Sequence, residues 1–562
     1  MTALLTDNLP LLVGAPNGIK KLRELILELA VRGKLVPQDP NDEPAGELLK
    51  RIAAEKKELS PKVKKSSEAP IGAVAFELPE SWCWASFGDI SQHNSGKTLD
   101  KGRNSGVPRN YITTSNLYWG RFDLVNIRQM LFEEKDLARC TAIKNDLLIC
   151  EGGEAGRAAV WDQESEICFQ NHVHRARFFG EISPYYAQRY LERLNYSGEI
   201  SEYRKGVGIS NMSSKSLASI PMPIPPLAEQ HRIVVKVDEL MALCDRLEAQ
   251  QADAESAHAQ LVQALLDSLT QASNAEDFAQ GWQRLAEHFH TLFITQSSID
   301  ALKQTLLQLA VMGKLVPQEP SDEPASELLK RVAEEKLRLV AEGEVRKPKA
   351  LLGISDEEIP FNLPQGWQWV RKADVFNFLN GYAFKSEWFQ QRGIRLLRNI
   401  NVAHGVVDWK EAACIQEEQA ADYQAFSLVE NDVVLTLDRP IISTGLKYAV
   451  IRRDDLPCLL LQRVAKISPY AASVTVGYLT IWLNSSFFVG AIDPGRSNGV
   501  PHISTNQVAG MLFALPPLEE QHRIVAKVDE LMALCDQLKV RLTQARQVHE
   551  QLATALVEQA VA

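Results

Sequence analysis

The chain of 562 residues lacks the cysteine patterns of a zinc site or a disulfide framework. Its eight cysteines form no Cys-x-x-Cys pair and show no spacing of metal ligands. Cys244 and Cys535 fall at matching positions of two helical segments, where we expect small buried thiols. The sequence also has no run of apolar residues long enough for a membrane span and no basic lead of a signal peptide. These absences favour a reducing compartment, the cytoplasm.

Short catalytic motifs are missing as well. The nearest match to a phosphate-binding loop is Gly96-Lys97-Thr98, but Ser91 stands where its first glycine should be. No Asn/Asp-Pro-Pro-Tyr/Phe of an amino-methyltransferase occurs, since both Pro-Pro pairs precede leucine. His231 and His522 have no His or Cys nearby at metal-ligand spacing. The sequence therefore predicts no catalytic residues, no metal site and no cofactor in this chain.

Positive charge is not in excess, because the formal net charge is −10. The acidic excess lies in residues 221–362, whereas the segments 77–220 and 363–516 are near neutral, with local clusters of Arg and Lys. A broad basic surface for non-specific nucleic-acid binding is thus excluded, but two small sites of contact with DNA are not.

Two long blocks each occur twice. Residues 225–247 read PPLAEQHRIVVKVDELMALCDRL and residues 516–538 read PPLEEQHRIVAKVDELMALCDQL. Residues 29–38 read LAVRGKLVPQ and residues 309–318 read LAVMGKLVPQ. The inserts between these blocks are barely alike. A repeat of this length is a duplication of whole domains rather than of a solenoid unit.

The repeated blocks have helical periodicity, with apolar residues such as Ile233, Val237 and Leu240 at three/four spacing. No proline or glycine interrupts residues 228–272, so this segment predicts one helix of about 40 residues, followed by helices near 299–312 and 325–342. The N-terminal block repeats the later part of the central block and the C-terminal block repeats the earlier part. We therefore expect two long antiparallel helices, with the chain ends packed together and an approximate two-fold repeat.

The inserts predict mixed α/β domains, since short β-branched and aromatic runs alternate with Gly, Asn and Asp. The expected strands are 110–114, 146–150 and 158–161 in the first insert and 394–397, 432–436 and 447–451 in the second. The fold class is α+β, and the expected division is 1–76, N-terminal helical region; 77–225, first domain; 226–361, central helical spacer; 362–516, second domain; 517–562, C-terminal helix packing with the N-terminal region.

These repeated blocks, alternating with unlike inserts, resemble the specificity (S) subunit of a type I restriction–modification enzyme over the whole chain. The resemblance implies two target-recognition domains, each reading one half of a split, asymmetric DNA sequence, and helices that fix the gap. It also implies docking of two modification subunits, with restriction subunits in the larger complex, in the bacterial cytoplasm. The S subunit of that family is not catalytic. S-adenosylmethionine, ATP and Mg²⁺, and the adenine methylation and ATP-dependent cleavage that use them, are expected on partner subunits.

Base edges are read by paired donors and acceptors on loops, and polar residues recur at similar offsets in both inserts with changed chemistry. Asn116 and Asn401 are identical in the two inserts, which favours a structural turn for them, whereas the differing pair Thr113/Arg398 favours specificity. For any one of these residues a solvated turn remains the alternative. The candidate DNA-binding residues are Lys97, Thr98, Arg109, Thr113, Thr114, Arg157, Asn171, His172, Lys205, Asn211, Tyr382, Arg395, Arg398, Asn399, Arg439, Lys447, Gln462, Arg463, Arg496, Asn498 and His502.

The start of each long helix carries the same three polar residues, which suggests a shared docking face. The candidate partner-binding residues are Gln230, His231, Arg232, Gln521, His522 and Arg523. A different class of function remains open: a non-catalytic helical scaffold whose inserts bind protein partners, or a duplicated adaptor, would have the same architecture and no sequence-dependent binding of DNA. A single-chain restriction or modification enzyme is disfavoured by the missing motifs.

Overall fold

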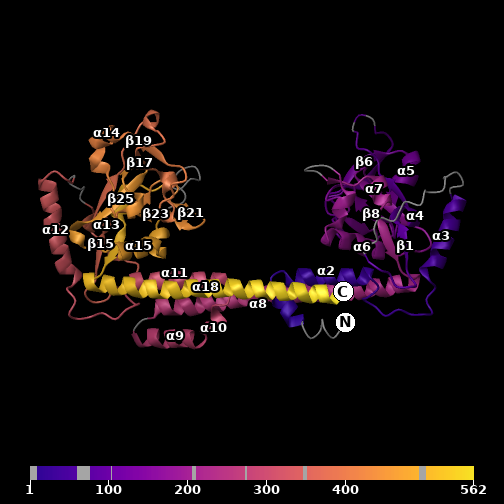
Figure 1. The fold of residues 1–562 in the computed structure, drawn as a ribbon, viewed down its shortest axis with the longest axis horizontal. Coiled ribbons are helices and arrows are strands. Elements are labelled where there is room, and N and C mark those ends of the chain that lie inside the picture. The colour runs from indigo at the N-terminus through magenta and orange to yellow at the C-terminus, as the bar shows by residue number, and fades with distance from the viewer. Residues whose placement is uncertain are drawn as a thin grey trace. The chain divides into compact units, whose positions relative to one another are not determined.

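The computed structural model describes residues 9–59, 76–100, 102, 104–205, 210–272, 275–345, 351–492 and 502–561. The chain forms two compact units, residues 1–255 with 544–562 and residues 256–543. Two long helices, α8 (Leu227–Gln271) and α18 (Leu518–Val561), each pass from one unit to the other (Figure 1). Each unit thus holds the start of one long helix and the end of the other, as expected for antiparallel helices.

The first unit contains the helices α2 (Gly18–Val31) and α3 (Ala45–Leu59) and a mixed α/β domain. One sheet of that domain has the strand order β10-β8-β12-β2 and is antiparallel. A second sheet, β6-β3-β11-β7, contains the parallel pair β3–β11. The strands span β2 (Ser91–Ser95), β3 (Val107–Ile112), β6 (Arg128–Phe132), β7 (Thr141–Ala142), β8 (Leu147–Cys150), β10 (Ala158–Val160), β11 (Ile167–Phe169) and β12 (Val173–Phe178).

In the second unit, α9 (Ala275–Glu287), α10 (Phe289–Leu292), α11 (Gln296–Val311) and α12 (Ala325–Ala341) precede the second domain. Its larger sheet has the order β16-β25-β20-β23-β18, and its smaller sheet the order β19-β17-β24. These strands span β16 (Phe376–Asn380), β17 (Ile394–Leu397), β18 (His404–Gly405), β19 (Ala413–Ile415), β20 (Val433–Thr436), β23 (Tyr448–Val450), β24 (Cys458–Leu460) and β25 (Val464–Pro469). The smaller sheet again contains one parallel pair, β17–β24.

In each domain the first and last strands pair with each other in antiparallel fashion, next to the point where the long helix begins. In the first domain β1 (Cys83–Ser86) pairs with β14 (Pro221–Ile224), and in the second β15 (Gln368–Arg371) pairs with β26 (Leu512–Leu515). The last strand is followed by Pro-Pro and then by the long helix. Apolar residues of the helix start, Ile233 and Ile524, are fully buried in the cores of their respective domains.

The expected helix boundaries agree with the structure, and the described part of the N-terminal region packs against the last turns of α18. The segment predicted as 228–272 is the helix Leu227–Gln271, and those near 299–312 and 325–342 are α11 and α12. Lys34 Nζ donates to the carbonyl of Val561 over 2.7 Å, and the equivalent Lys314 Nζ donates to the carbonyl of Thr270 over 2.6 Å. Each lysine thereby binds the carbonyl end of a long helix, where positive charge is favoured. The sequence did not reveal α9.

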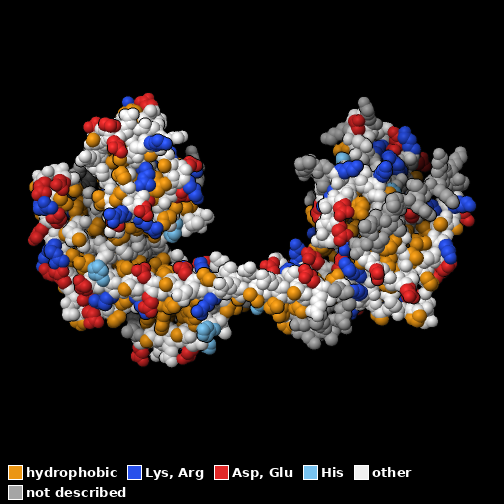
Figure 2. Space-filling model, in the orientation of Figure 1, with side chains coloured by type: hydrophobic (Ala, Val, Ile, Leu, Met, Phe, Trp, Pro, Cys, Tyr) orange, Lys and Arg blue, Asp and Glu red, His pale blue; other side chains and the backbone are white. Residues whose placement is uncertain are grey.

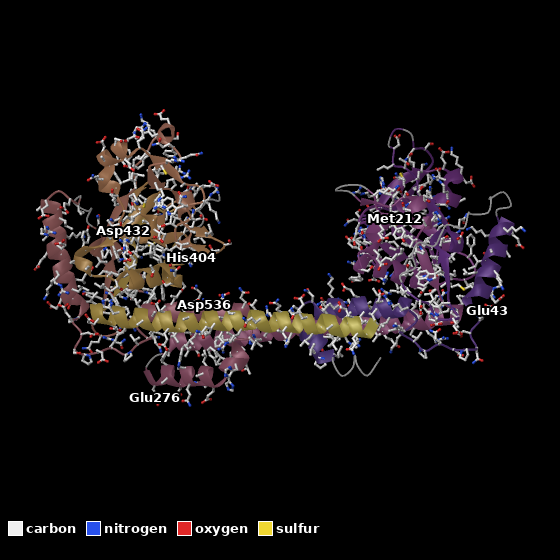
Figure 3. All side chains as sticks on the ribbon, viewed as in Figure 1. Glu43, Met212, Glu276, His404, Asp432 and Asp536 are labelled. Atoms are coloured by element: carbon white, nitrogen blue, oxygen red, sulfur yellow. The ribbon has the colours of Figure 1, made fainter. Side chains whose placement is uncertain are left out.

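Ion pairs join α2 to α8 in the first unit and α11 to α18 in the second unit, at equivalent positions of the repeat. In the first unit Arg23 pairs with Asp245 over 2.5 Å and with Glu248 over 2.9 Å. In the second unit Lys303 pairs with Asp536, the counterpart of Asp245 (Figure 3). A further pair there has the opposite order of charge, because Lys539 on α18 contacts Asp300 on α11, whereas the matching positions of the first unit are Glu248 and Lys20.

One pair of equivalent core positions differs sharply between the domains. After β1 the chain continues into α4 (Phe87–Ile90), and after β15 into α13 (Lys372–Val375), so Lys372 stands where the first domain has the buried Phe87. The Lys372 ammonium donates to the carbonyl of Leu512 over 3.0 Å and lies 4.8 Å from the Phe488 ring. Its burial lowers the pKa of Lys372 to about 7.

We predict that Lys372→Met stabilises the second unit by about 1–3 kcal/mol at pH 7, because a buried amine with one acceptor is costly. The folded-state pKa is depressed, so between pH 7 and the ordinary lysine pKa the unfolded state binds more protons. The wild-type protein should therefore gain stability as pH rises through this window, and the advantage of the variant should vanish. Thermal unfolding followed across this pH range measures both. Lys410→Met, at an exposed position, is the control, and equal pH slopes in the two proteins would contradict the prediction.

Candidate nucleic-acid interface

Each long helix begins in a buried polar network that fixes its domain. Glu229 accepts hydrogen bonds from Trp82 Nε1 over 3.0 Å and from Gln38 Nε2 over 2.5 Å. Glu520 repeats this arrangement with Trp367 over 2.9 Å and Gln318 over 3.1 Å. Burial raises the pKa of both carboxyl groups, and the hydrogen bonds lower it by less. These networks therefore hold the orientation of each domain on its own helix.

The glutamines and arginines predicted to bind partners instead have partners within their own units, close to this network. Gln230 is 0% exposed; its oxygen accepts from Ser183 N over 2.9 Å, and its amide donates to Pro225 O over 3.0 Å. Gln521, also 0% exposed, accepts from Thr475 N over 2.9 Å. The structure corrects this part of the prediction, because the glutamine side chains have internal partners and do not reach the surface.

Arg232 and Arg523 are likewise used inside each unit. Arg232 pairs with Asp42 over 2.6 Å, and Arg523 with Asp322 over 2.6 Å. Each pair ties the start of the long helix to the turn before α3 or α12. Of the six residues, only His231 and His522 have exposed side chains without such a role among the described residues.

The polar loops of the two domains can be matched through their backbone hydrogen bonds. Glu151 N donates to His172 O over 2.8 Å in the first domain, and Leu437 N donates to Arg463 O over 2.8 Å in the second. His172 and Arg463 therefore occupy equivalent places, each just before the central strand β12 or β25.

The same correspondence holds at the next loop. Met212 N donates to Glu151 O over 2.8 Å, and Ile503 N donates to Leu437 O over 2.9 Å (Figure 3 labels Met212). Asn211 and His502, which precede these residues, are thus equivalent. Two unlike sequences therefore place different polar side chains on one backbone pattern.

A basic side chain bridges the loops of each domain in the same way. Arg157 Nη2 donates to Thr114 O over 2.7 Å, and Lys447 Nζ donates to Asn399 O over 2.7 Å. Lys447 also donates to Asn399 Oδ1 over 2.6 Å, whereas Arg157 pairs with Glu154 over 3.0 Å. Burial lowers the pKa of Lys447.

In the second domain five predicted residues meet around one cavity of about 550 Å³. Asp438 binds two of the side chains there, Arg463 over 2.9 Å and His502 Nδ1 over 2.8 Å. Arg463 is 66% exposed even so, and can release this pairing for another anion. The cavity is lined by Asn399, Ile400, Asp438, Arg439, Ile442, Lys447, Arg463 and His502.

The first domain brings together the equivalent residues Thr114, Arg157, His172 and Asn211. Asn211 and Lys205 exchange two backbone hydrogen bonds, of 2.8 and 2.9 Å, and both side chains are exposed. His172, directly before β12, is exposed, whereas Arg157 is mostly covered and lies 5.4 Å from the Tyr118 ring. At these positions the first domain offers hydroxyl, guanidinium, imidazole and amide groups, where the second domain offers amide, ammonium, guanidinium and imidazole groups.

The predicted specificity pair Thr113/Arg398 is wrong for Thr113. Thr113 is 5% exposed, and its hydroxyl donates to Asn116 Oδ1 over 2.7 Å. Arg398 donates to the carbonyl of Glu411. By contrast, the structural turn predicted for the two shared asparagines is confirmed: Asn116 accepts from Thr113 N over 3.1 Å, and Asn401 accepts from Arg398 N over 3.2 Å.

Three other predicted residues make contacts within their own domains. Lys97 is 12% exposed and pairs with Asp136 over 2.5 Å. Arg395 donates to the carbonyls of Asp454 and Leu456 over 2.8 and 3.1 Å. Tyr382 packs in an aromatic cluster, with its ring 4.6 Å from that of Tyr423. These side chains stabilise loops of their own domains. The sequence alone does not distinguish a polar side chain that stabilises a loop from one that is free to contact DNA.

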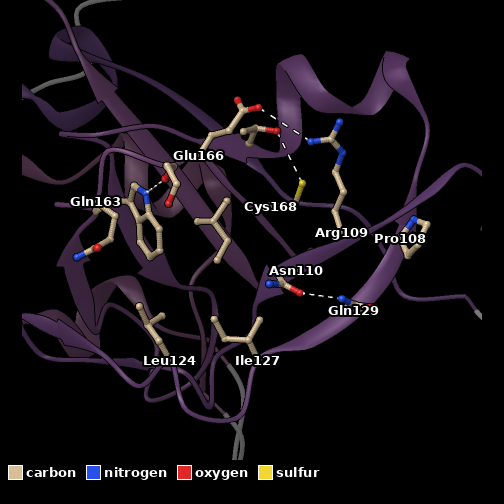
Figure 4. Close-up of a pocket in the computed structure, with 13 residues that line it drawn as sticks. Pro108, Arg109, Asn110, Leu124, Ile127, Gln129, Gln163, Glu166 and Cys168 are labelled. Carbon is tan, nitrogen blue, oxygen red and sulfur yellow. Dashed lines mark hydrogen bonds and ion pairs between the residues drawn. The ribbon is translucent and has the colours of Figure 1, made fainter.

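The remaining predicted residues are dispersed. Arg109 lines a different cavity, of about 490 Å³, where it faces Glu166 at 4.0 Å (Figure 4). Thr98 and Gln462 are exposed, and Asn171 is half-buried. Arg496 and Asn498 lie outside the described residues. The sequence did not single out Asp438, Ile400 or Ile442; the position of Asp438 two residues after a predicted strand was the available signal for that residue.

Charge is mixed rather than uniformly basic over the visible face of both domains (Figure 2). Within the described residues, no cluster of three or more His, Cys, Asp or Glu side chains could hold a metal ion. A search of the same residues finds no helix with the length and apolar character to cross a membrane. Two mixed α/β domains with matched polar loops on a duplicated helical frame define a binding protein with two separate binding domains.

Comparison with known proteins identifies the family. The model of the type I restriction modification DNA specificity domain matches residues 79–255. The specificity subunits of the Escherichia coli type I restriction enzymes EcoAI and EcoEI are 48% and 36% identical, each over 97% of this chain and 94% of its own length. The solved HsdS subunit from Thermoanaerobacter tengcongensis is 16% identical, covers 87% of this chain and 98% of that chain, and has a TM-score of 0.43. The chain belongs to the specificity subunits of type I restriction–modification systems.

We predict that Asn116→Ala or Asn401→Ala destabilises its own domain by about 2–3 kcal/mol, because each change removes three hydrogen bonds from a largely buried turn. Amide hydrogen exchange should show lost protection confined to the altered domain. Asn126→Ala, at an exposed position of the first domain, is the control. A loss below about 0.5 kcal/mol in both variants would rule out the turn as a structural constraint.

Proposed function

We propose that each domain reads one half of a bipartite, asymmetric DNA sequence through its matched loops. The observation that carries this proposal is the pairing of equivalent positions with changed chemistry: Thr114 with Asn399, Arg157 with Lys447, His172 with Arg463, and Asn211 with His502. A constant backbone frame with variable donors is what recognition of two different half-sites requires.

The chemistry of these loops suits DNA. Guanidinium and ammonium groups bind phosphates and guanine edges, whereas amide groups pair with adenine edges. A good bidentate contact discriminates between bases by about 1–3 kcal/mol. Because both inserts are near neutral in net charge, we expect the affinity of the chain for DNA to depend on partners that hold the backbone.

The partners that we propose are two modification subunits and, in the larger complex, restriction subunits. The names of the relatives, which are specificity subunits of type I restriction enzymes, support this assignment. S-adenosylmethionine, ATP and Mg²⁺ would be bound by those partners, which would perform adenine methylation and ATP-dependent cleavage in the bacterial cytoplasm. Exposed His231 and His522 mark one equivalent surface at each helix start. A stable assembly with a single modification subunit in native mass spectrometry would contradict two docking sites.

Methylome sequencing tests the reading function. We expect adenine methylation at one bipartite motif in cells that express this chain with its modification subunit, and none in cells that lack only this chain. The equivalent variants His172→Ala and Arg463→Asn should each relax or change one half of the motif, with a 10- to 100-fold loss at the contacted base (~1–3 kcal/mol). Asparagine is chosen at position 463 because its backbone is left-handed, at φ 70°.

The two variants serve as controls for each other, since each should leave the other half unchanged. If an active complex methylates no motif that depends on this chain, the reading function is excluded and a scaffold that binds proteins becomes the better assignment.

We further propose that α8 and α18 set the gap between the half-sites. Deleting residues 250–256 of α8 together with the matching residues 541–547 of α18 removes two turns from both helices, about 10 Å. We expect the unspecified gap of the motif to shorten by about 3 base pairs, with both half-sites retained. Remapping of the methylated motif measures the gap, and an unchanged gap in a still active complex would exclude the helices as its determinant.

A further inference from the structure

The second domain contains an additional hairpin at the edge of the cavity of about 550 Å³ that is lined by Lys447, Arg463 and His502. Between β20 and β23 the chain runs through residues 437–447, whereas the equivalent connection of the first domain, between β8 and β10, comprises only residues 151–157. The additional residues form β21 (Ile441–Ile442) and β22 (Gly445–Leu446). The first domain has no counterpart of this hairpin among its described residues.

The base of the hairpin is held firmly. Lys447 N donates to Pro440 O over 2.6 Å, and the imidazole Nδ1 of His404 lies 2.9 Å from Leu446 O (Figure 3). Gly445 has φ 121°, and a Cβ there would lie 2.9 Å from the His404 ring, so only glycine fits. The hairpin is therefore presented in one position rather than as a loose loop.

Its two isoleucines face different surroundings. Ile442 lines the cavity that contains Lys447, Arg463 and His502, and Ile400 lines the same cavity from a neighbouring loop. Ile442 is 38% exposed and Ile400 is 54% exposed. Ile441, also 38% exposed, instead lines a separate cavity formed with α11 and α15.

The cavity holds Arg439, Lys447 and Arg463 against one carboxylate, that of Asp438, so exposed apolar side chains beside these groups suit a ligand that is anionic overall and apolar at one point. DNA meets this description, since phosphates flank the bases and the C5-methyl of thymine is the one apolar group on the major-groove edge of the base pairs. An apolar contact with that methyl distinguishes thymine from cytosine, which lacks it.

We propose that Ile442 and Ile400 contact the C5-methyl group of a thymine in the half-site that the second domain reads. This inference rests on the proposed function, and it assigns specificity to side chains that carry no hydrogen-bonding group. At the position of Ile400 the first domain has Ser115, whose hydroxyl is bonded to Thr113 over 2.7 Å, and it lacks the hairpin. The half-site of the first domain is therefore read without this contact.

The test pairs removal of a methyl group from DNA with removal of methyl groups from the protein. The full chain, in complex with its modification subunits, is titrated with duplexes in which each thymine of the half-site is replaced in turn by deoxyuridine. One replacement should weaken binding about three- to fivefold, the effect of one buried methyl group. In Ile442→Ala and Ile400→Ala the thymine duplex should bind more weakly, and the difference between thymine and uracil should disappear.

Ile441→Ala is the matched control, because it removes the same atoms from the other face of the hairpin and should leave the difference between thymine and uracil intact. All three side chains are partly exposed, so the variants should retain the unfolding temperature of the parent, which is measured in parallel. Replacing thymine by deoxyuridine in the half-site of the first domain should change the affinity of the duplex by the same factor in the parent and in all three variants.

Three results would overturn the inference while sequence-specific binding persists: a half-site without an A·T pair, no thymine whose replacement weakens binding, or a difference that survives in the Ile442→Ala, Ile400→Ala double variant. Loss of all sequence-dependent binding by the parent complex would instead overturn the proposed function together with this inference.

Discussion

The buried carboxylate at the start of each long helix is the constraint on which the remaining architecture depends. Glu229 and Glu520 lie in apolar surroundings, and each is tolerated only because a tryptophan and a glutamine donate to it. Loss of any one donor would leave charge or a polar group unpaired in the core. The helix start, the entry strand of the domain and the turn after the short helix must therefore be retained together, which accounts for the near identity of the repeated blocks.

That constraint leaves the distal loops free to change. The backbone bonds among these loops are the same in both domains, whereas the side chains that they carry differ at each of the matched positions. Stability resides in the frame and, in our proposal, recognition in the loops, so one can vary without disturbing the other. Lys372, a buried amine where the first domain has Phe87, shows that even the core of each domain tolerates substitution away from the frame.

The long helices, the strands expected in both inserts and the shared asparagine turns could be predicted from the sequence, because periodicity and near-identical repetition report directly on backbone geometry. The residues that we propose to read DNA could be predicted only in part. Lys97, Thr113 and Arg395 have the right functional groups, but their donors are occupied by neighbours distant in sequence. Ile400 and Ile442, which we propose to contact thymine, could not be predicted for the opposite reason, since apolar residues in a sequence predict burial and nothing local marks them as exposed.

The reversed ion pair between Lys539 and Asp300 bears on how a duplicated chain avoids assembling wrongly. The repeated blocks are similar enough for a short helix to meet the other long helix during folding, and internal duplication invites such exchange. An exchanged α2 would place Lys20 opposite Lys539, and an exchanged α11 would place Asp300 opposite Glu248. Each like-charge contact costs only a few tenths of a kcal/mol at an exposed site. The two act in the same direction, however, and give each half of the molecule a means of recognising itself.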